Sequence, residues 1–402
     1  MKKILVLNSG SSSVKYQLFE AEGDNFRVLA KGLVERIGLP GSVISYSGET
    51  EPKLSKTMDF PNHDAAIKEV LQVLLRHNIK SLDEIDAVGH RMGHGGEYFD
   101  KSVVIDDDVR KKIYDAVELI PLHGPALILG MEAVTRLLPN IKQVATFDTA
   151  YHQTMPKEAY LYALPLEQYE KYGIRKYGFH GTSHAYIAQE AEKMLGHKGR
   201  FISCHLGSGA SVTAIKDGKS VDTTMGFTPM VGMIMGTRCG DIDAYLPFHI
   251  MKTQNKTMDE VNNMLNRQSG LLGLSGYPDM REILEHYVAG EEKAITAVNV
   301  YVHQLIKHIG AFVAVLGGLD ALIFTGGVGE NSGFIRKLVC NRLSYLGLSL
   351  DEKANHVVGQ KDVISAPESK AKILVIPANE ELMIAKDTYA LLDDNVRIEN
   401  IA

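Results

Sequence analysis

Short apolar runs alternate with segments of helical periodicity along the whole chain. A run of about four to eight apolar or alternating residues is typical of a strand, and apolar residues at a spacing of about three or four are typical of a helix. Because the two patterns follow one another from end to end, the sequence predicts an α/β fold. The expected strands span residues 3–8, 14–20, 85–90, 142–147, 200–206, 211–216, 321–325 and 372–377.

Two distant segments, residues 4–20 and 201–218, repeat one pattern. Each has an apolar strand, a turn of Gly and Ser, and an alternating second strand, and a Ser-Val pair begins that second strand at Ser13 and at Ser211. A Gly-Ser turn presents backbone N–H groups and hydroxyls that suit phosphate oxygens. We interpret the repeat as a duplicated domain whose two turns bind one polyphosphate from both sides. The alternative is that the two segments are ordinary β-hairpins.

Two helix starts are also visible. Pro125 follows Gly124, and proline is favoured in the first turn of a helix. Asn379 precedes Glu380 and Glu381, a combination typical of an N-cap followed by acids that interact favourably with the helix dipole.

Composition narrows the class of protein. With 402 residues, 45% of them hydrophobic, the chain is long enough for two or three domains, each with a core. The net charge of −6 has both signs dispersed, so we expect no nucleic-acid partner. The longest apolar tract, residues 309–319, is too short to span a bilayer. The three cysteines, Cys204, Cys239 and Cys340, lack metal-type spacing, which favours reduced thiols and a cytoplasmic location without membrane contact.

Charged and polar residues gather beside glycines or at strand ends, where α/β folds bind their ligands. Two arginines, two histidines and one carboxylate form a set that suits an anion better than a metal, since no metal-binding motif accompanies them. A solvated or structural role is the alternative for any one of them. The five are Arg91, His123, Asp148, His180 and Arg238.

A third Gly-rich segment, residues 323–332, follows an apolar strand and opens a helical pattern. Its glycine spacing is not GxGxxG, and the chain has no GxxxxGK[ST] motif, which disfavours a nicotinamide dehydrogenase and a P-loop protein. Close approach of the backbone to a nucleotide remains one interpretation, and a helix-capping turn is the other.

Nine motifs, in order and across nearly the whole chain, closely resemble the acetate kinase family. The resemblance implies two duplicated actin-like ATPase (ribonuclease H-like) domains with the active site in the cleft between them. It places one domain at residues 1–148 plus 383–402 and the other, which binds the nucleotide, at residues 149–382. The motifs are NSGSSSVKYQLFE, GHRMGHGGE, FDTAYHQTMP, YGFHGTSH, HLGSGAS, MGFTP, MGTRCGDID, FTGGVGENS and IPANEELMIA.

The same resemblance implies site roles. Asp148 matches the catalytic aspartate, and His180 and Arg238 match the groups that stabilise the transition state. Arg91 matches the arginine that holds the acyl carboxylate, and His123 a further histidine at the phosphate. Gly93, Leu122, Phe179 and Pro229 match positions around the acyl methyl group.

Further matches concern ATP and the metal. Asn8 and Glu380 match the positions that serve Mg²⁺, for which Mn²⁺ is an alternative. The residues that match the first phosphate loop are Ser11, Ser12, Ser13 and Lys15. Those that match the second phosphate loop are His205, Leu206, Gly207, Ser208 and Gly209. Those that match the adenosine segments are Asp279, Met280 and Arg281, and Gly327, Val328, Gly329, Glu330 and Asn331.

The chain departs from the family pattern at four positions. Gly93 stands where the family has a valine in the acyl pocket, so a deeper pocket and a preference for propionate are the alternative to acetate. Ser208 replaces an asparagine in the second phosphate loop, which leaves the choice of phosphoryl donor open. Gly124 replaces another asparagine, and Val231 a glutamate.

We therefore expect a cytoplasmic phosphotransferase that moves a phosphoryl group reversibly between ATP and acetate by direct in-line transfer. The acyl carboxylate, with a pKa of about 4 to 5 by analogy with Glu, is already ionised at neutral pH and needs no general base. A non-catalytic actin-like ATP-binding module is the alternative from another class, although it has no reason to carry Arg91, His180 and Arg238 together. The resemblance also implies a homodimer.

Overall fold

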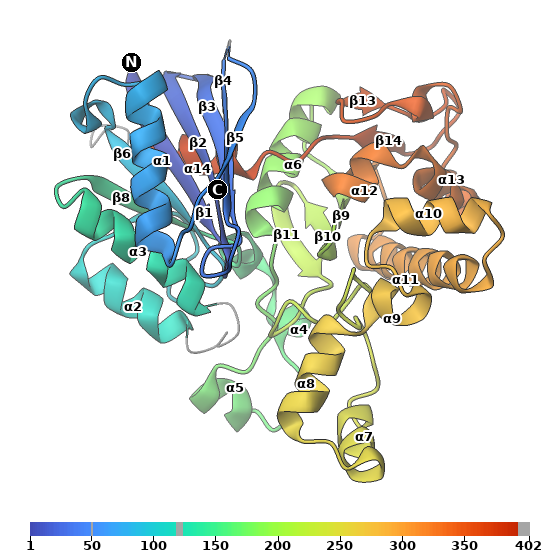
Figure 1. Ribbon diagram of the computed structural model, residues 1–402. Coiled ribbons are helices and arrows are strands. Elements are labelled where there is room, and N and C mark those ends of the chain that lie inside the picture. The colour runs from blue at the N-terminus through green and yellow to red at the C-terminus, as the bar shows by residue number, and fades with distance from the viewer. Residues whose placement is uncertain (50, 118–123, 393–402) are drawn as a thin grey trace. The chain divides into compact units, whose positions relative to one another are not determined.

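The computed structural model describes residues 1–49, 51–117 and 124–392, and the chain divides into two compact units. The first comprises Met1–Tyr151 with the segment from Asn379 onward, and the second comprises His152–Ala378. Each contains one mixed sheet with helices beside it (Figure 1). The predicted α/β fold is thereby confirmed.

The first unit is built on an eight-stranded sheet with the order β5-β4-β3-β2-β1-β6-β8-β7. Strand β1 pairs in parallel with β6, β6 pairs in parallel with β8, and the other pairs are antiparallel. The strands are β1 (Lys2–Ser9), β2 (Ser13–Glu22), β3 (Asn25–Glu35), β4 (Val43–Gly48), β5 (Leu54–Thr57), β6 (Ala87–Met92), β7 (Val103–Val104) and β8 (Lys142–Phe147). The helices are α1 (His63–His77), α2 (Asp107–Val117), α3 (Gly124–Leu137) and α14 (Glu380–Ala390).

The second unit has a six-stranded sheet with the order β11-β10-β9-β12-β14-β13. The strands are β9 (Arg200–Leu206), β10 (Ala210–Lys216), β11 (Lys219–Thr223), β12 (Ala321–Thr325), β13 (Asp362–Val363) and β14 (Lys372–Val375). The helices are α4 (Lys157–Tyr160), α5 (Glu167–Tyr172), α6 (Gly181–Leu195), α7 (Leu246–Gln254), α8 (Met258–Arg267), α9 (Gly270–Ser275), α10 (Met280–Val288), α11 (Glu292–Leu316), α12 (Gly326–Asn331) and α13 (Gly333–Arg342). Among the helices of the described residues, none combines the length and apolar character needed to cross a membrane.

The two sheets share a strand order. In the first, β3-β2-β1 is an antiparallel meander followed by the parallel strands β6 and β8, and in the second, β11-β10-β9 is followed by the parallel strands β12 and β14. The two Gly-Ser turns occupy equivalent places, between β1 and β2 and between β9 and β10. This arrangement agrees with the duplication predicted from the repeated sequence pattern.

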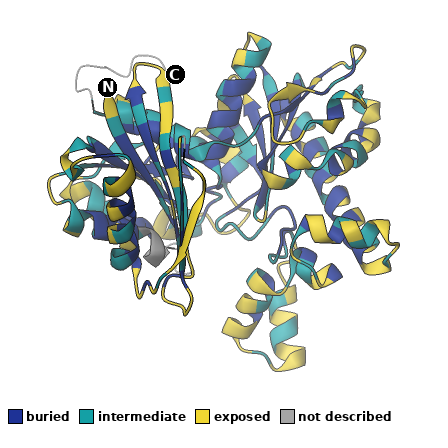
Figure 2. Cartoon of the chain, turned by 45° about the horizontal axis from the view of Figure 1, so that its top comes forward, coloured by how far each residue is buried: buried dark blue, intermediate teal, exposed yellow. Residues whose placement is uncertain are grey.

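Strand β1 shows why an apolar run becomes a central strand. Ile4 to Leu7 are fully or almost fully buried, because each face of the strand meets a different core. Figure 2 shows dark blue, buried stretches in the strands of both sheets. Leu5 and Leu7 join an apolar cluster with residues of α1 and α3. Ile4 and Val6 pack in a cluster that contains Ile384 of α14.

Both predicted helix starts are confirmed. Helix α3 begins at Gly124, which puts Pro125 in its first turn. Helix α14 begins at Glu380, and the Asn379 side chain accepts a hydrogen bond from the backbone N–H of Leu382. The cap positions Glu380 at the start of the helix.

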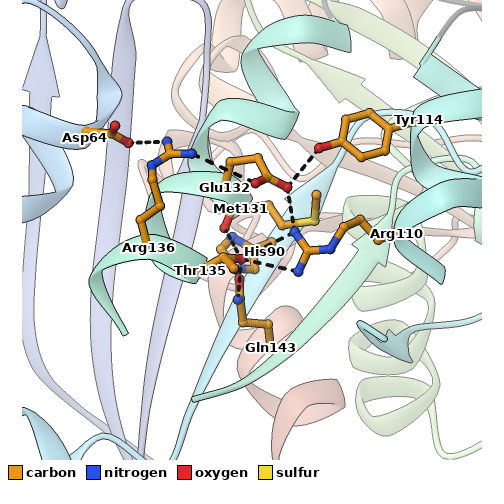
Figure 3. Close-up of polar contacts among 9 residues, drawn as sticks. All are labelled: Asp64, His90, Arg110, Tyr114, Met131, Glu132, Thr135, Arg136 and Gln143. Carbon is orange, nitrogen blue, oxygen red and sulfur yellow. Dashed lines mark hydrogen bonds and ion pairs between the residues drawn. The ribbon is translucent and has the colours of Figure 1, made fainter. Parts of the chain in front are cut away.

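A buried polar network ties β6 and β8 to the helices beside them (Figure 3). His90 Nε2 lies 2.8 Å from Gln143 Oε1, and Gln143 Nε2 donates to Thr135 Oγ1 at 3.0 Å. Arg110 donates to Thr135 Oγ1 and also to Glu132, at 2.5 Å. Burial lowers the pKa of His90 to about 4, so the imidazole is neutral and its Nε2 hydrogen is donated to Gln143. The network joins α2 and α3 to the strand that carries Arg91.

Candidate active site

In the first unit, the ends of two parallel strands bring Arg91 and Asp148 together. Arg91 lies near the end of β6, and Asp148 directly follows the neighbouring strand β8. Arg91 Nε donates to Asp148 Oδ1 at 3.1 Å, and Nη2 donates to Oδ2 at 2.5 Å. A two-point contact of this kind fixes the plane of the guanidinium group as well as its position.

Asn8 and Glu380 meet the same guanidinium. Arg91 Nη1 donates to Asn8 Oδ1 at 3.3 Å, and Arg91 Nε lies 3.5 Å from Glu380 Oε2. Asn8 comes from the end of β1 and Glu380 from the first turn of α14. The structure therefore brings together four residues that the sequence predicted to share a site.

Acidic groups outnumber basic groups at this point. Three carboxylates, those of Asp148, Glu380 and Glu381, lie near two basic groups, Arg91 and Lys15, and Lys15 Nζ lies 2.7 Å from Glu381 Oε1. Burial first, and then the carboxylates of Asp148 and Glu381, raise the pKa of Glu380. The excess of negative charge favours a bound cation. The sequence analysis gave Glu381 no role in the site, although it stands beside Glu380 in the same motif.

The donor set of the first unit fits Mg²⁺. No group of three His, Cys, Asp or Glu side chains in the described part of the chain is arranged to hold a metal ion. Mg²⁺ commonly takes only one or two protein carboxylates and completes its shell with water and phosphate oxygens. The amide oxygen of Asn8 and the carboxylate of Glu380, both within reach of Arg91, supply oxygen ligands of the required type.

The first phosphate loop is a tight turn between β1 and β2. The N–H of Gly10 donates to the carbonyl of Ser13 at 2.8 Å. A Cβ at Gly10 would lie 2.9 Å from Ser13 Oγ, so a larger residue there would require the Ser13 side chain to move. Ser11 and Lys15 are exposed, whereas Ser12 and Ser13 are half-buried.

In the second unit, the second phosphate loop contacts the Gly-rich segment of α12. Thr325, at the end of β12, is paired with His205 at the end of β9. Gly326 follows with a φ of +74°, and a Cβ there would lie 2.9 Å from the backbone of Leu206. The close approach of the two backbones therefore depends on glycine. The structure thus brings the start of the second phosphate loop, His205 and Leu206, against the residues that begin the Gly-rich segment.

His180 and Arg238 converge on Gly209 of that loop. A Cβ at Gly209 would lie 3.4 Å from His180 Nε2 and 3.7 Å from Arg238 Nη1. His180 immediately precedes helix α6 and has a left-handed backbone, with a φ of +57°. Two side chains with nitrogen donors therefore lie beside the same point of the loop.

Arg238 has no carboxylate partner among the described residues. Its Nη1 donates to the Pro229 carbonyl at 3.0 Å and lies 3.4 Å from Met235 Sδ. Burial lowers the pKa of Arg238. A half-buried guanidinium paired only with neutral atoms favours the binding of an anion.

The two predicted adenosine segments, residues 279–281 and 327–331, differ in the burial and hydrogen bonds of their side chains. Arg281 is exposed and pairs with Asp279, whose side chain also caps α10 by accepting from the Arg281 N–H at 2.9 Å. Met280 is buried in the core. Glu330 Oε1 accepts from the N–H groups of Gly326 and Ala378. Gly327 and Asn331 are exposed, Val328 and Glu330 are half-buried, and Gly329 is buried.

The four residues predicted around the acyl methyl group, and the predicted phosphate contact His123, are placed only in part. Gly93 is half-buried in the first unit, while Phe179 is buried and Pro229 half-buried in the second. Leu122 and His123 lie outside the described residues. The described members of this set belong to different units, and the acyl pocket stays a prediction.

Comparisons with known proteins agree with these motifs. Residues 3–386 match the sequence profile of the Acetokinase family. An acetate kinase of Carboxydothermus hydrogenoformans is 51% identical over 396 residues, which cover 97% of this chain and 99% of that protein. The crystal structure of Porphyromonas gingivalis acetate kinase matches with a TM-score of 0.92 and 45% identity, covering 98% of this chain and 100% of that one. A propionate kinase structure from Francisella tularensis matches with a TM-score of 0.92 and 42% identity, covering 97% and 99%. The chain therefore belongs to the acetokinase family.

Proposed function

We propose that this chain catalyses the reversible, Mg²⁺-dependent transfer of a phosphoryl group from ATP to acetate, which gives acetyl phosphate and ADP. The observation that carries this proposal is the 51% identity to an acetate kinase over 97% of the chain. The geometry supports it as well, because each unit presents a guanidinium group beside a predicted phosphate loop or strand end.

On the acceptor side, Arg91 binds the acetate carboxylate. The carboxylate is the nucleophile and is already ionised at neutral pH, so its oxygen attacks the γ-phosphorus without a base. The two-point contact with Arg91 supports a positioning role for Asp148, which holds the guanidinium in the orientation that a carboxylate requires. Asp148 takes no proton from the substrate.

On the donor side, His180 and Arg238 stabilise the charge of the transferring phosphoryl group. An arginine in this role raises the rate by about 10³- to 10⁵-fold in other phosphoryl transfers. Residues 205–209, with Ser11, Ser12, Ser13 and Lys15, bind the phosphates, and residues 279–281 and 327–331 bind the adenosine. The convergence of His180 and Arg238 on Gly209 supports this assignment.

Asn8 and Glu380 hold Mg²⁺, or Mn²⁺ in its place. A divalent cation there neutralises phosphate charge that would otherwise repel the acyl carboxylate. The raised pKa of Glu380 and the excess of carboxylates around Arg91 support a cation at this position.

Propionate is the competing acceptor. Gly93 lacks the side chain that valine supplies in the acetate kinase pattern, and the propionate kinase of Francisella tularensis is as similar in structure as the acetate kinase of Porphyromonas gingivalis. A coupled assay of ADP release with acetate, propionate and butyrate decides between them. If none of the three acids stimulates ADP release, the proposed function is wrong.

We also propose that the chain acts as a homodimer in the cytoplasm. Helix α7 buries none of its residues, and Phe248 on it and the adjoining Tyr245 are two-thirds exposed, which supports a contact with a second copy (Figure 2). The three free thiols, Cys204, Cys239 and Cys340, support a reducing compartment. Sedimentation of the protein and of a Phe248→Ser variant tests the dimer, because the variant is expected to dissociate more readily.

A further inference from the structure

A chain of hydrogen bonds leads from the sheet of the second unit to His180. His184, one turn along α6, has its Nδ1 2.9 Å from Ser203 Oγ of β9 and its Nε2 2.8 Å from Ser211 Oγ of β10. The same Ser211 Oγ lies 2.9 Å from Nδ1 of His180. Ser203, His184 and Ser211 are completely buried, so these polar groups lie away from bulk water.

His184 carries one ring hydrogen. Burial, followed by the neighbouring His152 and His205, lowers the pKa of His184 well below its ordinary value. A neutral imidazole donates from one nitrogen and accepts at the other. The direction of every hydrogen bond in the chain therefore depends on which nitrogen of His184 holds the hydrogen.

In one arrangement of the hydrogen bonds, both serine hydroxyl hydrogens and the His184 ring hydrogen are donated to an acceptor. Ser203 O–H donates to His184 Nδ1, His184 Nε2–H donates to Ser211, and Ser211 O–H donates to His180 Nδ1. Each contact then has one donor and one acceptor, and both buried hydroxyl hydrogens are paired. His180 receives a hydrogen bond at Nδ1, which leaves its own hydrogen on Nε2.

The opposite arrangement leaves a buried donor unpaired. If His180 held a hydrogen on Nδ1, Ser211 would accept it and would donate to His184 Nε2, and His184 Nδ1–H would donate to Ser203. The Ser203 hydroxyl hydrogen would then have no acceptor, because His184 is its only hydrogen-bond partner among the described residues. An unpaired buried donor is costly, and so this arrangement is disfavoured, whether His180 is neutral or an imidazolium.

We propose that the Ser203–His184–Ser211 chain holds His180 as the neutral tautomer with its hydrogen on Nε2, and so aims an uncharged N–H donor at the second phosphate loop. His184 and Ser211 are thus positioning residues, and the proposal rests on the role of His180 in the proposed function. It adds that His180 binds the phosphoryl oxygen as a neutral donor, while Arg238 supplies the positive charge beside Gly209.

The contact with a second imidazole supports a neutral His180. The His180 and His205 rings lie 4.3 Å apart with an angle of 32° between their planes. His205 Nδ1 lies 2.9 Å from Ser183 Oγ, so that ring is itself held in place. A positive charge on one of two such close rings would be placed against a neighbour that offers no negative charge.

A ¹⁵N spectrum of histidine-labelled protein at neutral pH tests the tautomer directly. Ring nitrogens with and without a hydrogen have distinct ¹⁵N shifts, and the spectrum of a His180→Gln variant identifies the His180 signals. We expect His180 to show a bare Nδ1 and a protonated Nε2. A hydrogen on Nδ1, in a neutral ring or an imidazolium, would overturn the proposal. Because this measurement needs no turnover, it is independent of whether acetate is the substrate.

Kinetics of a matched pair of variants provides the second test. Ser211→Ala removes the hydroxyl that donates to His180, and we expect kcat to fall by about tenfold or more while the KM for ATP changes little, because the donor acts on the transferring phosphoryl group. Thr213→Val is the control, since Thr213 is equally buried two residues along β10 but its hydroxyl pairs with Thr223. We expect less than about a twofold change in the control. An equal loss of kcat in both variants, or an unchanged kcat in Ser211→Ala, would contradict the positioning role. If neither the parent protein nor the variants turn over acetate, propionate or butyrate, the proposed function fails, while the ¹⁵N spectrum still decides the tautomer.

Discussion

Asp148 accepts two hydrogen bonds from the Arg91 guanidinium, with Oδ1 3.1 Å from Nε and Oδ2 2.5 Å from Nη2. The Asp148 side chain is almost fully buried and both of its oxygens contact the guanidinium. This relationship supports a carboxylate that orients an arginine rather than one that removes a proton. It also agrees with the chemistry of an acyl substrate that arrives already ionised.

We expect Arg238→Ala to lower kcat/KM by at least about 10²- to 10³-fold, because the variant lacks the guanidinium that lies beside Gly209 of the second phosphate loop and that we assign to the transferring phosphoryl group. Arg238→Lys should recover only part of the loss, since an ammonium lacks the fork geometry of a guanidinium. Arg267→Ala, which removes an exposed arginine of the same unit, is the control. Steady-state kinetics with ATP and acetate measures all three. Turnover of Arg238→Ala close to that of the control would refute the assigned role.

Glu380→Gln should raise the Mg²⁺ concentration that gives half-maximal activity. The amide keeps the size of the side chain but removes the charge that attracts the cation, and we expect an increase of about tenfold. Glu84→Gln, which alters an ion pair with Lys3 elsewhere in the first unit, is the control. A magnesium titration that superimposes on that of the parent protein would mean that Glu380 does not serve the metal.

A substitution at Gly93 tests whether the protein prefers acetate or propionate. If the missing side chain deepens the pocket, propionate should match or exceed acetate in kcat/KM, since one methylene is worth roughly 1 to 3 kcal/mol in pocket discrimination. Gly93→Val should then shift the preference back toward acetate. The measurement is kcat/KM for both acids in both proteins. Rejection of propionate by more than about tenfold in the parent protein, a difference near 1.4 kcal/mol, would leave acetate as the preferred substrate.

The buried network around His90 predicts a difference between two substitutions in the first unit (Figure 3). Gln143→Leu leaves His90 Nε2–H without an acceptor, and we expect a loss of about 1 to 3 kcal/mol in the free energy of unfolding. Arg136→Ala removes an ion pair with Asp64 in which both side chains are about half exposed, and should cost at most about 1 kcal/mol. Urea unfolding of the two variants makes the comparison. Equal losses would contradict the greater cost expected for leaving a buried donor unpaired.

Asp387 predicts a pH dependence of stability. Burial raises the pKa of Asp387 from its ordinary value of 3.8 to about 6, although the Ser102 hydroxyl 2.6 Å away opposes the rise. The folded protein therefore keeps this proton at a pH where the unfolded chain has lost it, and stability falls as the pH rises from about 4 to about 6. Asp387→Asn removes this dependence. Its stability relative to the parent protein should be greater at pH 8 than at pH 4, by up to about 3 kcal/mol. Urea unfolding of both proteins at pH 4 and pH 8 measures the difference in their free energies of unfolding. If that difference is the same at both pH values, the raised pKa of Asp387 is contradicted.

The sequence predicted the central strands well and the outer ones poorly. All eight expected strands are present, and 142–147, 200–206 and 321–325 have the expected bounds. These strands are largely buried, so their residues form the apolar runs that a pattern search detects. The strands that were missed lie on the antiparallel side or at the sheet edges, where exposed polar residues interrupt the pattern. They are β3, β4, β5, β7, β11 and β13.

The family and the α/β fold followed from the sequence alone, because nine motifs and the apolar strands are properties of short stretches of chain. Tertiary structure decided the partners of the polar groups. Nothing in the order of residues indicated that Asp148 contacts Arg91 at two points, that Arg238 pairs with the Pro229 carbonyl and the Met235 sulfur, or that Ser211 lies between His180 and His184. The placement of a hydrogen on a histidine depends on burial and on distances of about 3 Å between atoms from different strands and helices. Folding sets those distances, and the local pattern of a sequence does not encode them.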